Sequence, residues 1–331
     1  NNCCVTTILG TSENNLVQCN IGADNFIDPL SQSNTATGQF DSQAEQDNIA
    51  AVSQNFVADN TCDSTGTNIA FCENSAFNAV QNIIQSNSAD GLLDAASTQV
   101  NDALVDQNMV LLNDCDEADD GFNGVTCLNH FTDQFIFGPI TQTSFNSAGA
   151  QAAGATVAQS NEVGITQNLQ STNDCDELGI GNNRAFCDNH ALNRILPITQ
   201  SNTAAVADDF VQNNLIAISQ DLQETNDCDE EGEGSSGPSQ FCTNSAQNII
   251  GPVSQSNTAT GTEVSDISQN IDLSMNQLLL ADNECSESGF GDNRAICSTG
   301  GNNDIDAVTQ SNDAAGDQFT DFFQDNDATF S

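Results

Sequence analysis

The stretch that decides the fold is Leu30-Ser31-Gln32-Ser33-Asn34-Thr35-Ala36-Thr37-Gly38. Its side chains alternate with a period of two, so that Leu30, Gln32, Asn34 and Ala36 share one face while serines and threonines take the other. A period of two is the signature of a β-strand. The same pattern returns five more times along the chain, around Gln85, Gln142, Gln200, Gln255 and Gln310. The sequence therefore predicts one strand of this kind in each of six repeats.

The amides of these strands share a face with aliphatic residues, which predicts that they point inward. A buried amide is costly unless its donors and acceptors are paired. Identical amides stacked one above another satisfy this requirement by forming a ladder. In the third copy the Asn is displaced by two residues, which keeps its face. The predicted ladder residues are Gln32, Asn34, Gln85, Asn87, Gln142, Asn146, Gln200, Asn202, Gln255, Asn257, Gln310 and Asn312.

Cysteines recur in phase with this pattern. After the second Cys of each local pair a Gln follows thirteen residues later, or fifteen in one case, and another Gln precedes the first Cys of five pairs by eight residues. These earlier glutamines also lie in alternating stretches and predict a second strand per repeat: Gln54, Gln107, Gln167, Gln220 and Gln277. The stretch that leads into the first strand, such as residues 191–196, fits either a short helix or a third strand.

The spacing predicts one disulfide per repeat. The expected pairs are Cys62–Cys72, Cys115–Cys127, Cys175–Cys187, Cys228–Cys242 and Cys285–Cys297, with Cys19 paired to Cys4 or Cys3. We take Cys4 as the partner of Cys19 and Cys3 as a candidate for a bond between subunits. Regular disulfides indicate a compartment outside the reducing cytosol. Because residue 1 is Asn, we expect a secreted or cell-surface chain whose signal peptide has been removed.

The chain has 331 residues, 47 acidic side chains, three Lys or Arg together and a formal charge of -44. Binding to nucleic acid or to an anionic membrane surface needs basic residues, so both partners are excluded. No apolar run is long enough to cross a membrane as a helix. With two His and cysteines expected in disulfides, nucleophilic catalysis has few candidate groups, and we expect no enzyme.

The segments between paired cysteines are acidic and rich in Gly. Several carboxylates on one tight loop can supply oxygen ligands to Ca²⁺, although a solvated acidic surface is the favoured explanation. The candidate ion ligands are Asp114, Asp116, Glu117, Asp119 and Asp120. An Asn stands two residues before the first Cys in five repeats and is interpreted as a turn residue; these are Asn60, Asn113, Asn173, Asn226 and Asn283.

Together these patterns predict an all-β fold: a β-solenoid-like array of six stacked modules of about 55 residues, each with a disulfide-closed acidic loop. The approximate modules of this single array are residues 1–58, 59–112, 113–171, 172–224, 225–281 and 282–331.

The repeated pattern aliphatic-x-Gln-x-Asn-x-Ala resembles the repeats of curlin-type amyloid fibre subunits and of other Asn/Gln-rich surface fibre proteins. Curlin repeats are much shorter and lack disulfide loops. The resemblance implies stacked strands and extracellular fibre formation. We therefore expect a secreted structural protein that polymerises head-to-tail with itself into a filament, such as a surface fibre or a biofilm matrix component, with cations as further partners.

Three alternatives remain open at this point. Six repeats of this length also suit a closed six-bladed β-propeller that acts as a binding module. A β-helical protein that binds or degrades polysaccharide could use paired carboxylates. Threonines at every second position, as in Thr258-x-Thr260-x-Thr262, are also compatible with an ice-binding solenoid.

Overall fold

The computed structural model describes most of the chain as stacked β-strands. The described residues are 2–9, 15–37, 43–65, 68–90, 96–118, 121–122, 124–147, 156–179, 181–182, 184–205, 209–233, 239–261, 266–290, 294–316 and 321–331. Within these ranges every regular element is a strand. The strands form three large parallel sheets and one two-stranded sheet. The predicted all-β, solenoid-like repeat fold is confirmed.

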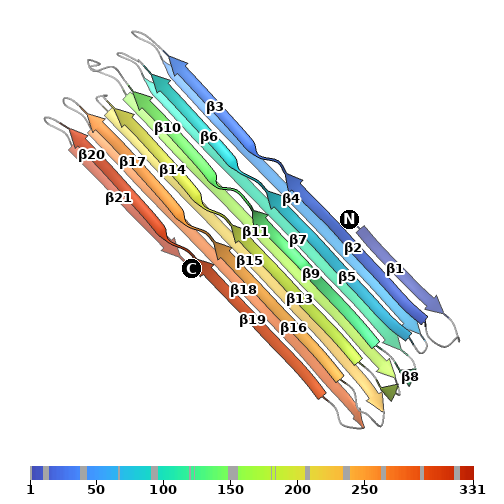
Figure 1. Ribbon diagram of the computed structural model, residues 1–331. Helices are drawn as coiled ribbons and strands as arrows, with labels where there is room; N and C mark the ends of the chain where they lie inside the picture. The colour runs from blue at the N-terminus through green and yellow to red at the C-terminus, as the bar shows by residue number, and fades with distance from the viewer. Residues whose placement is uncertain are drawn as a thin grey trace.

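One coil of the solenoid consists of a long strand followed by two shorter ones. In the second coil β4 (Ala44–Thr65) runs in one direction, and β5 (Asn68–Val80) and β6 (Ile83–Asp90) return in the other. The next long strand, β7 (Ser97–Ala118), then lies beside β4. The segment whose structure was left open between helix and strand is thus a strand. Figure 1 shows the resulting elongated, two-layered body.

The equivalent strands of successive coils form one sheet, so the three strands of a coil belong to three different sheets. The long-strand sheet contains β1 (Asn2–Leu9), β4, β7, β11 (Thr156–Gly179), β15 (Asp209–Glu233), β18 (Asp266–Phe290) and β21 (Asp321–Phe330) in this order. The second sheet contains β2 (Asn15–Ile27), β5, β9 (Gly124–Ile136), β13 (Arg184–Ile195), β16 (Ser239–Ile250) and β19 (Arg294–Ile305). The third contains β3 (Leu30–Thr37), β6, β10 (Ile140–Ser147), β14 (Ile198–Ala205), β17 (Val253–Gly261) and β20 (Val308–Gly316), and β8 (Gly121–Phe122) pairs with β12 (Gly181–Asn182).

Equivalent residues of successive coils lie in register. Ala44 pairs with Ser97, and Ser97 with Val157, although the coils differ in length. Most of the extra residues fall in the connections between strands, and one lies in a bulge within β9. All described strand pairings are parallel, whereas the blades of a propeller are antiparallel sheets. The alternative of a closed six-bladed propeller is wrong, because the coils stack in a line.

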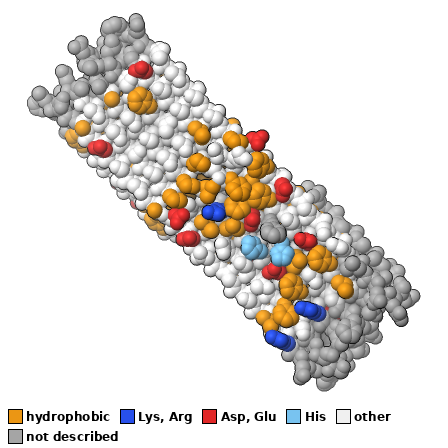
Figure 2. Space-filling model, viewed as in Figure 1, with side chains coloured by type: hydrophobic (Ala, Val, Ile, Leu, Met, Phe, Trp, Pro, Cys, Tyr) orange, Lys and Arg blue, Asp and Glu red, His pale blue; other side chains and the backbone are white. Residues whose placement is uncertain are grey.

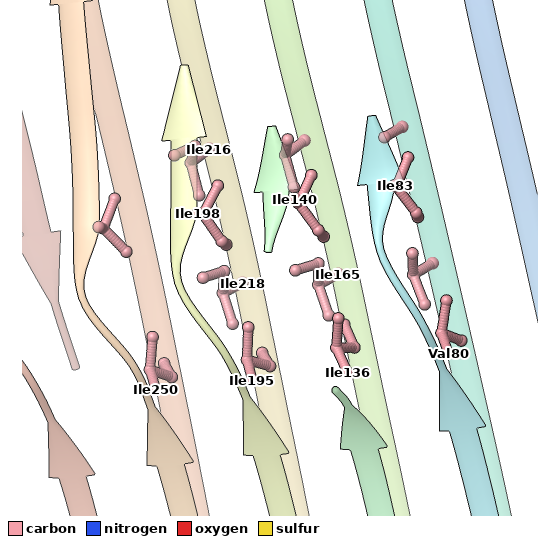
Figure 3. Close-up of a cluster of buried hydrophobic side chains, with 14 of the residues drawn as sticks. Val80, Ile83, Ile136, Ile140, Ile165, Ile195, Ile198, Ile216, Ile218 and Ile250 are labelled. Atoms are coloured by element: carbon pink, nitrogen blue, oxygen red, sulfur yellow. The ribbon is translucent and has the colours of Figure 1, made fainter. Parts of the chain in front are cut away.

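The bend between the second and third sheets holds the main aliphatic core. Ile195 and Ile198 flank the bend Leu196–Pro197, and both are fully buried against Ile216 and Ile218 of the long strand β15. Figure 3 shows the same arrangement repeated in neighbouring coils, with Ile136 and Ile140 one coil earlier. Pro suits this bend because it has no N–H to pair. In four coils a Pro lies immediately before the strand of the third sheet: Pro29, Pro139, Pro197 and Pro252.

The first prediction concerns this core. We expect Ile198→Ala to lower the free energy of unfolding by about 2–5 kcal/mol, because the fully buried site cannot collapse around the smaller side chain. The neighbouring substitution Thr199→Ala, on the partly exposed opposite face, is the control and should change little. Urea unfolding of both variants measures the difference. Equal losses for the two variants would contradict the assigned inward face.

Candidate functional site

A ladder of glutamines runs along the interior face of the third sheet. Gln85 Nε2 donates to Gln32 Oε1 at 2.9 Å, and Gln142 Nε2 donates to Gln85 Oε1 at 2.8 Å. The series continues through Gln200, Gln255 and Gln310 with donor–acceptor distances of 2.8, 2.9 and 3.2 Å. The middle four side chains are fully buried. Each side chain is thus donor to the coil before it and acceptor for the coil after it.

The long strands carry two further glutamine ladders. One runs from Gln54 through Gln107, Gln167, Gln220 and Gln277, with side chains 2.7–2.8 Å apart. Sequence analysis singled out these glutamines as strand markers. The other runs from Gln46 through Gln99, Gln159, Gln212, Gln269 and Gln324 and was not predicted. Its signal is present in the sequence, since Gln46 precedes Gln54 by an even number of residues and therefore shares its face.

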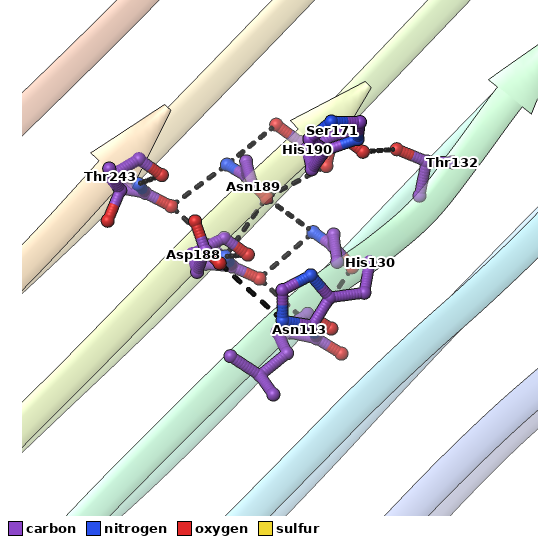
Figure 4. Close-up of polar contacts among 12 residues, drawn as sticks. Asn113, His130, Thr132, Ser171, Asp188, Asn189, His190 and Thr243 are labelled. Carbon is purple, nitrogen blue, oxygen red and sulfur yellow. Dashed lines mark hydrogen bonds and ion pairs between the residues drawn. The ribbon is translucent and has the colours of Figure 1, made fainter. Parts of the chain in front are cut away.

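Asparagines cross the interior and connect opposite layers. Asn161 Nδ2 donates to Asn202 Oδ1 at 2.9 Å across the layers and to Asn214 Oδ1 at 3.0 Å along the stack. A second network surrounds Asn189, whose Nδ2 donates to Asn226 Oδ1 at 2.8 Å and to Asn244 Oδ1 at 3.1 Å. Figure 4 shows the network around Asn189. These crossing bonds fix the two layers relative to each other as well as the coils along the stack.

Two interpretations of asparagines are corrected by the structure. Asn146 was predicted to continue the ladder, but Ile140 and Gln142 pair with Ile83 and Gln85 without a shift, so Ser144 occupies the Asn row. Asn146 stacks on alanines instead. The turn interpretation of the Asn before each first Cys is also wrong. These side chains lie on the inner face with the Cys, and Asn173, for example, donates to Asn226 at 3.0 Å.

The cysteines form one continuous column between the long strands and the second sheet. The structure contains Cys62–Cys72, Cys115–Cys127, Cys175–Cys187, Cys228–Cys242 and Cys285–Cys297 as pairs, and it also places Cys187 against Cys228. Cys19 is buried at the start of the column. The side chains of Cys3 and Cys4 lie outside the described residues, so their roles stay predictions. The backbone register places Thr6, and neither of these cysteines, beside Cys62.

Within the described residues, two groups of side chains could hold a metal ion. They are Cys175, Cys187 and Cys228, and Cys242, Cys285 and Cys297, whose sulfur atoms lie within 4.8 Å of one another. Three thiolates suit soft ions, but only after reduction of the disulfides. The candidate Ca²⁺ loop is only partly described. Asp114 and Asp116 lie on β7, whereas Asp119, Asp120 and the side chain of Glu117 lie outside the described residues.

The parallel register stacks the acidic residues of these loops in columns. Asp114, Asp174 and Asp227 pair coil to coil, as do Asp116, Asp176 and Asp229. Partial burial together with the carboxylates of neighbouring coils raises the pKa of Asp174 to about 6. Burial and the Asp229 carboxylate likewise raise the pKa of Asp176. Like charges in adjacent rungs repel, so these columns favour protons or bound cations at neutral pH.

A buried Glu224 lies close to the Asn189 network. Burial, followed by the nearby charge of Asp188, raises the pKa of its carboxyl group to about 9. The side chain is fully buried and is therefore protonated at neutral pH.

A histidine lies on the outer side of the second sheet. His130 Nε2 is 3.5 Å from Asp188 Oδ2 (Figure 4). At this point a bulge in β9 places two residues opposite one residue in each neighbouring strand.

The types of side chain on the outer surface change along the length of the molecule. Hydrophobic side chains gather near the middle of the face shown in Figure 2, beside the two histidines, and acidic groups are scattered around them. Phe135 stacks on Phe137 with ring centroids 4.7 Å apart, and the ring centroids of Phe77 and Phe135 are 5.6 Å apart.

In the part of the chain that the structure describes, no helix has the length and hydrophobicity needed to span a membrane.

Comparisons with known proteins give no relative from which to transfer a function. No protein-family model, no curated protein and no solved structure matches the chain.

The second prediction tests the amide ladder. Gln200→Leu removes a bond to Gln142 and one from Gln255 and leaves both buried partners incompletely paired. We expect a loss on the order of 3 kcal/mol in the free energy of unfolding. Gln310→Leu, at the half-exposed end of the same ladder, is the matched control and should lose less than about 1 kcal/mol, because water can replace the missing partner. Chemical denaturation of both variants measures the contrast, and equal losses would rule out a dominant ladder contribution.

The third prediction concerns pH. The folded-state pKa of Asp174, about 6, lies above its ordinary value of 3.8, so protonation favours the folded state. Stability from this group is complete below about 3.8 and is lost as pH rises through about 6. We expect Asp174→Asn to flatten the fall in melting temperature between pH 4 and pH 7.

Asp106→Asn is the control for this measurement. It removes an equal charge from the same sheet, but Asp106 pairs with Ser53 and Thr166 in the neighbouring coils. Added Ca²⁺ should raise the wild-type melting temperature at pH 7 more than at pH 4. An unchanged pH profile in Asp174→Asn would show that the acidic column does not control stability.

Proposed function

We propose that the protein is the structural subunit of an extracellular filament in which copies stack head-to-tail. The observation that carries this proposal is that the glutamine ladder of the third sheet runs from the first coil to the last and stops at a half-exposed amide at either end. These amides are Gln32 and Gln310. The disulfides fit an oxidising extracellular setting.

The two ends of this ladder are complementary. Both N–H groups of Gln310 are used, toward Gln255 Oε1 and Asp327 O, so its Oε1 is available to accept a bond from a further coil. Gln32 Nε2 donates to Ile49 O at 2.8 Å and has a second N–H to donate. A second copy stacked on the last coil would bring its Gln32 to this oxygen and continue the ladder with the same geometry.

The aliphatic core also stops at the last coil. Phe322 and Phe330 of β21 occupy the inward rows of Ile267 and Met275, yet they are 49% and 50% exposed. The corresponding rows begin at Ala44 and Val52 in β4. β4 of a second copy would cover both rings and remove exposed apolar surface. In the same stack, β1 of that copy, which pairs with residues 58–65 of its own β4, would share a row with β21.

Charge determines when such stacking can occur. With a formal charge of -44, copies repel each other at low ionic strength. Salt screens this repulsion, and Ca²⁺ bound to the carboxylate columns would lower the net charge of each copy. We therefore propose that cations, Ca²⁺ among them, promote assembly, and that the filament belongs to a surface fibre or matrix.

The fourth prediction tests stacking through the ladder ends. We expect Gln310→Glu with Asn312→Asp to abolish filaments in negative-stain micrographs of protein in Ca²⁺ and salt, because two carboxylates would be buried at the junction. The matched control, Thr309→Asp with Ser311→Asp, adds carboxylates to the same strand on its exposed outer face and should still form filaments.

Circular dichroism checks that both double variants keep the β-fold. Normal polymerisation by the Gln310/Asn312 variant would refute stacking through these residues. Loss of filaments in both variants would show that added charge alone prevents assembly. Particles of one fixed length in the wild-type protein under all salt conditions would contradict the filament itself.

A further inference from the structure

The cysteine column contains two mutually exclusive sets of disulfides. Cys187 is placed against Cys175 of its own coil and also against Cys228 of the next coil, and Cys228 lies in turn against Cys242. A cysteine forms one disulfide at a time. The geometry therefore offers a within-coil set, such as Cys175–Cys187, and a between-coil set, such as Cys187–Cys228.

Contacts toward the next coil recur along the column. Cys72 Sγ lies 3.9 Å from the carbonyl oxygen of Asp114, and Cys127 Sγ lies 3.6 Å from that of Asp174. These two residues directly precede the long-strand cysteines of the following coils, Cys115 and Cys175. At the last coil the sulfur atoms of Cys242, Cys285 and Cys297 lie within 4.8 Å of one another. Cys228 and Cys285 thus each lie between two sulfur partners, and Cys72 and Cys127 make contacts in the same direction in the earlier coils.

The cysteines of the column differ in their exposure to solvent. From Cys62 to Cys242 every cysteine is at most 1% exposed, so reagents in solution cannot reach these sulfur atoms. Cys297 is exposed and its partner Cys285 is half-buried. Among the described cysteines, Cys297 is therefore the one that a dissolved thiol can attack.

We propose that Cys297 is a site of modification by small thiols and that this modification is transmitted through the buried column by disulfide exchange. The thiolate of a molecule such as glutathione attacks Cys297 Sγ, forms a mixed disulfide there and releases the Cys285 thiolate. This thiolate attacks Cys242, forms Cys242–Cys285 and releases Cys228. Cys228 attacks Cys187 in the same way, forms Cys187–Cys228 and releases Cys175.

Every step breaks one S–S bond, forms another and passes one thiolate onward, so no oxidant is consumed. The same step can repeat from Cys175 through Cys127 and Cys115 to Cys72, and the thiolate then resides on Cys62. Within-coil disulfides close loops with sequence separations of 10–14, whereas Cys187–Cys228 spans 41. Longer loops remove more conformational entropy from the unfolded chain, so the between-coil set would stabilise the folded chain more strongly against unfolding. The exchange thereby links successive coils covalently along the long axis.

Disulfide mapping of the unassembled protein tests this inference independently of filament formation. The protein is incubated with one equivalent of isotopically labelled glutathione, remaining thiols are blocked with maleimide, and the chain is digested with pepsin at acid pH, because it contains only three Lys or Arg together. We expect labelled glutathione on Cys297, new links Cys242–Cys285 and Cys187–Cys228, and maleimide on Cys62 rather than Cys285. Glutathione on Cys297 with maleimide on Cys285 and unchanged within-coil links would overturn transmission. Absence of glutathione from Cys297 would overturn the site itself.

Two double variants give a matched comparison. Cys228→Ala with Cys242→Ala interrupts the column next to the modified coil, and the maleimide should then remain on Cys285. Cys62→Ala with Cys72→Ala removes one disulfide at the far end and should still yield Cys187–Cys228. If the Cys62/Cys72 variant keeps its within-coil links and carries the maleimide on Cys285, transmission through the column is overturned.

Discussion

The solenoid depends on the requirement that a buried amide be paired on every side. A Gln in a nearly dry interior cannot rely on water, and an identical Gln in the next coil presents an acceptor and a donor at the spacing of parallel strands. Gln200 meets this requirement with Gln142 on one side and Gln255 on the other. The same requirement fixes the register, because a slip of one residue would turn the amides out and the hydroxyl face in.

This constraint leaves the connections free to vary. Equivalent positions are separated by 53 residues between Gln54 and Gln107 but by 60 between Gln107 and Gln167. The hydrogen bonds between the buried glutamines are nevertheless 2.7 and 2.8 Å long across the two intervals. Where a coil does depart from the pattern, as at the bulge beside His130, the change affects the outer surface, while the inward Thr132 keeps the row of Ala76 and Ala191.

The sequence was sufficient to predict the rows but not how the layers meet across the interior. Period two identified the inward face of Gln32 and its equivalents, and constant spacing identified the local cysteine pairs. Asn113 was interpreted as a turn residue because Asn is common in turns, yet its even spacing from Cys115 places it on the inner face. Asn146 was misplaced because its offset of two residues was taken as a shift of the ladder position along the strand. The strand keeps its register with β6, so Asn146 pairs with Ala89. The contact of Cys187 with Cys228 depends on the distance between coils, which spacing along one repeat does not contain.

The placement of charge explains why growth in the proposed filament would be directional. Acidic groups such as Asp47, Asp102 and Asp272 lie on the outer faces, where they oppose contact between the sides of two copies. The rows exposed at the ends are amides and apolar groups, including Gln310 and Phe330, which gain partners only from another coil. An open sheet edge is normally a hazard that charged residues block. Here the sides carry the blocking charge and the ends carry the unfinished ladder, so the physics that favours the next coil within the chain also favours the first coil of another copy.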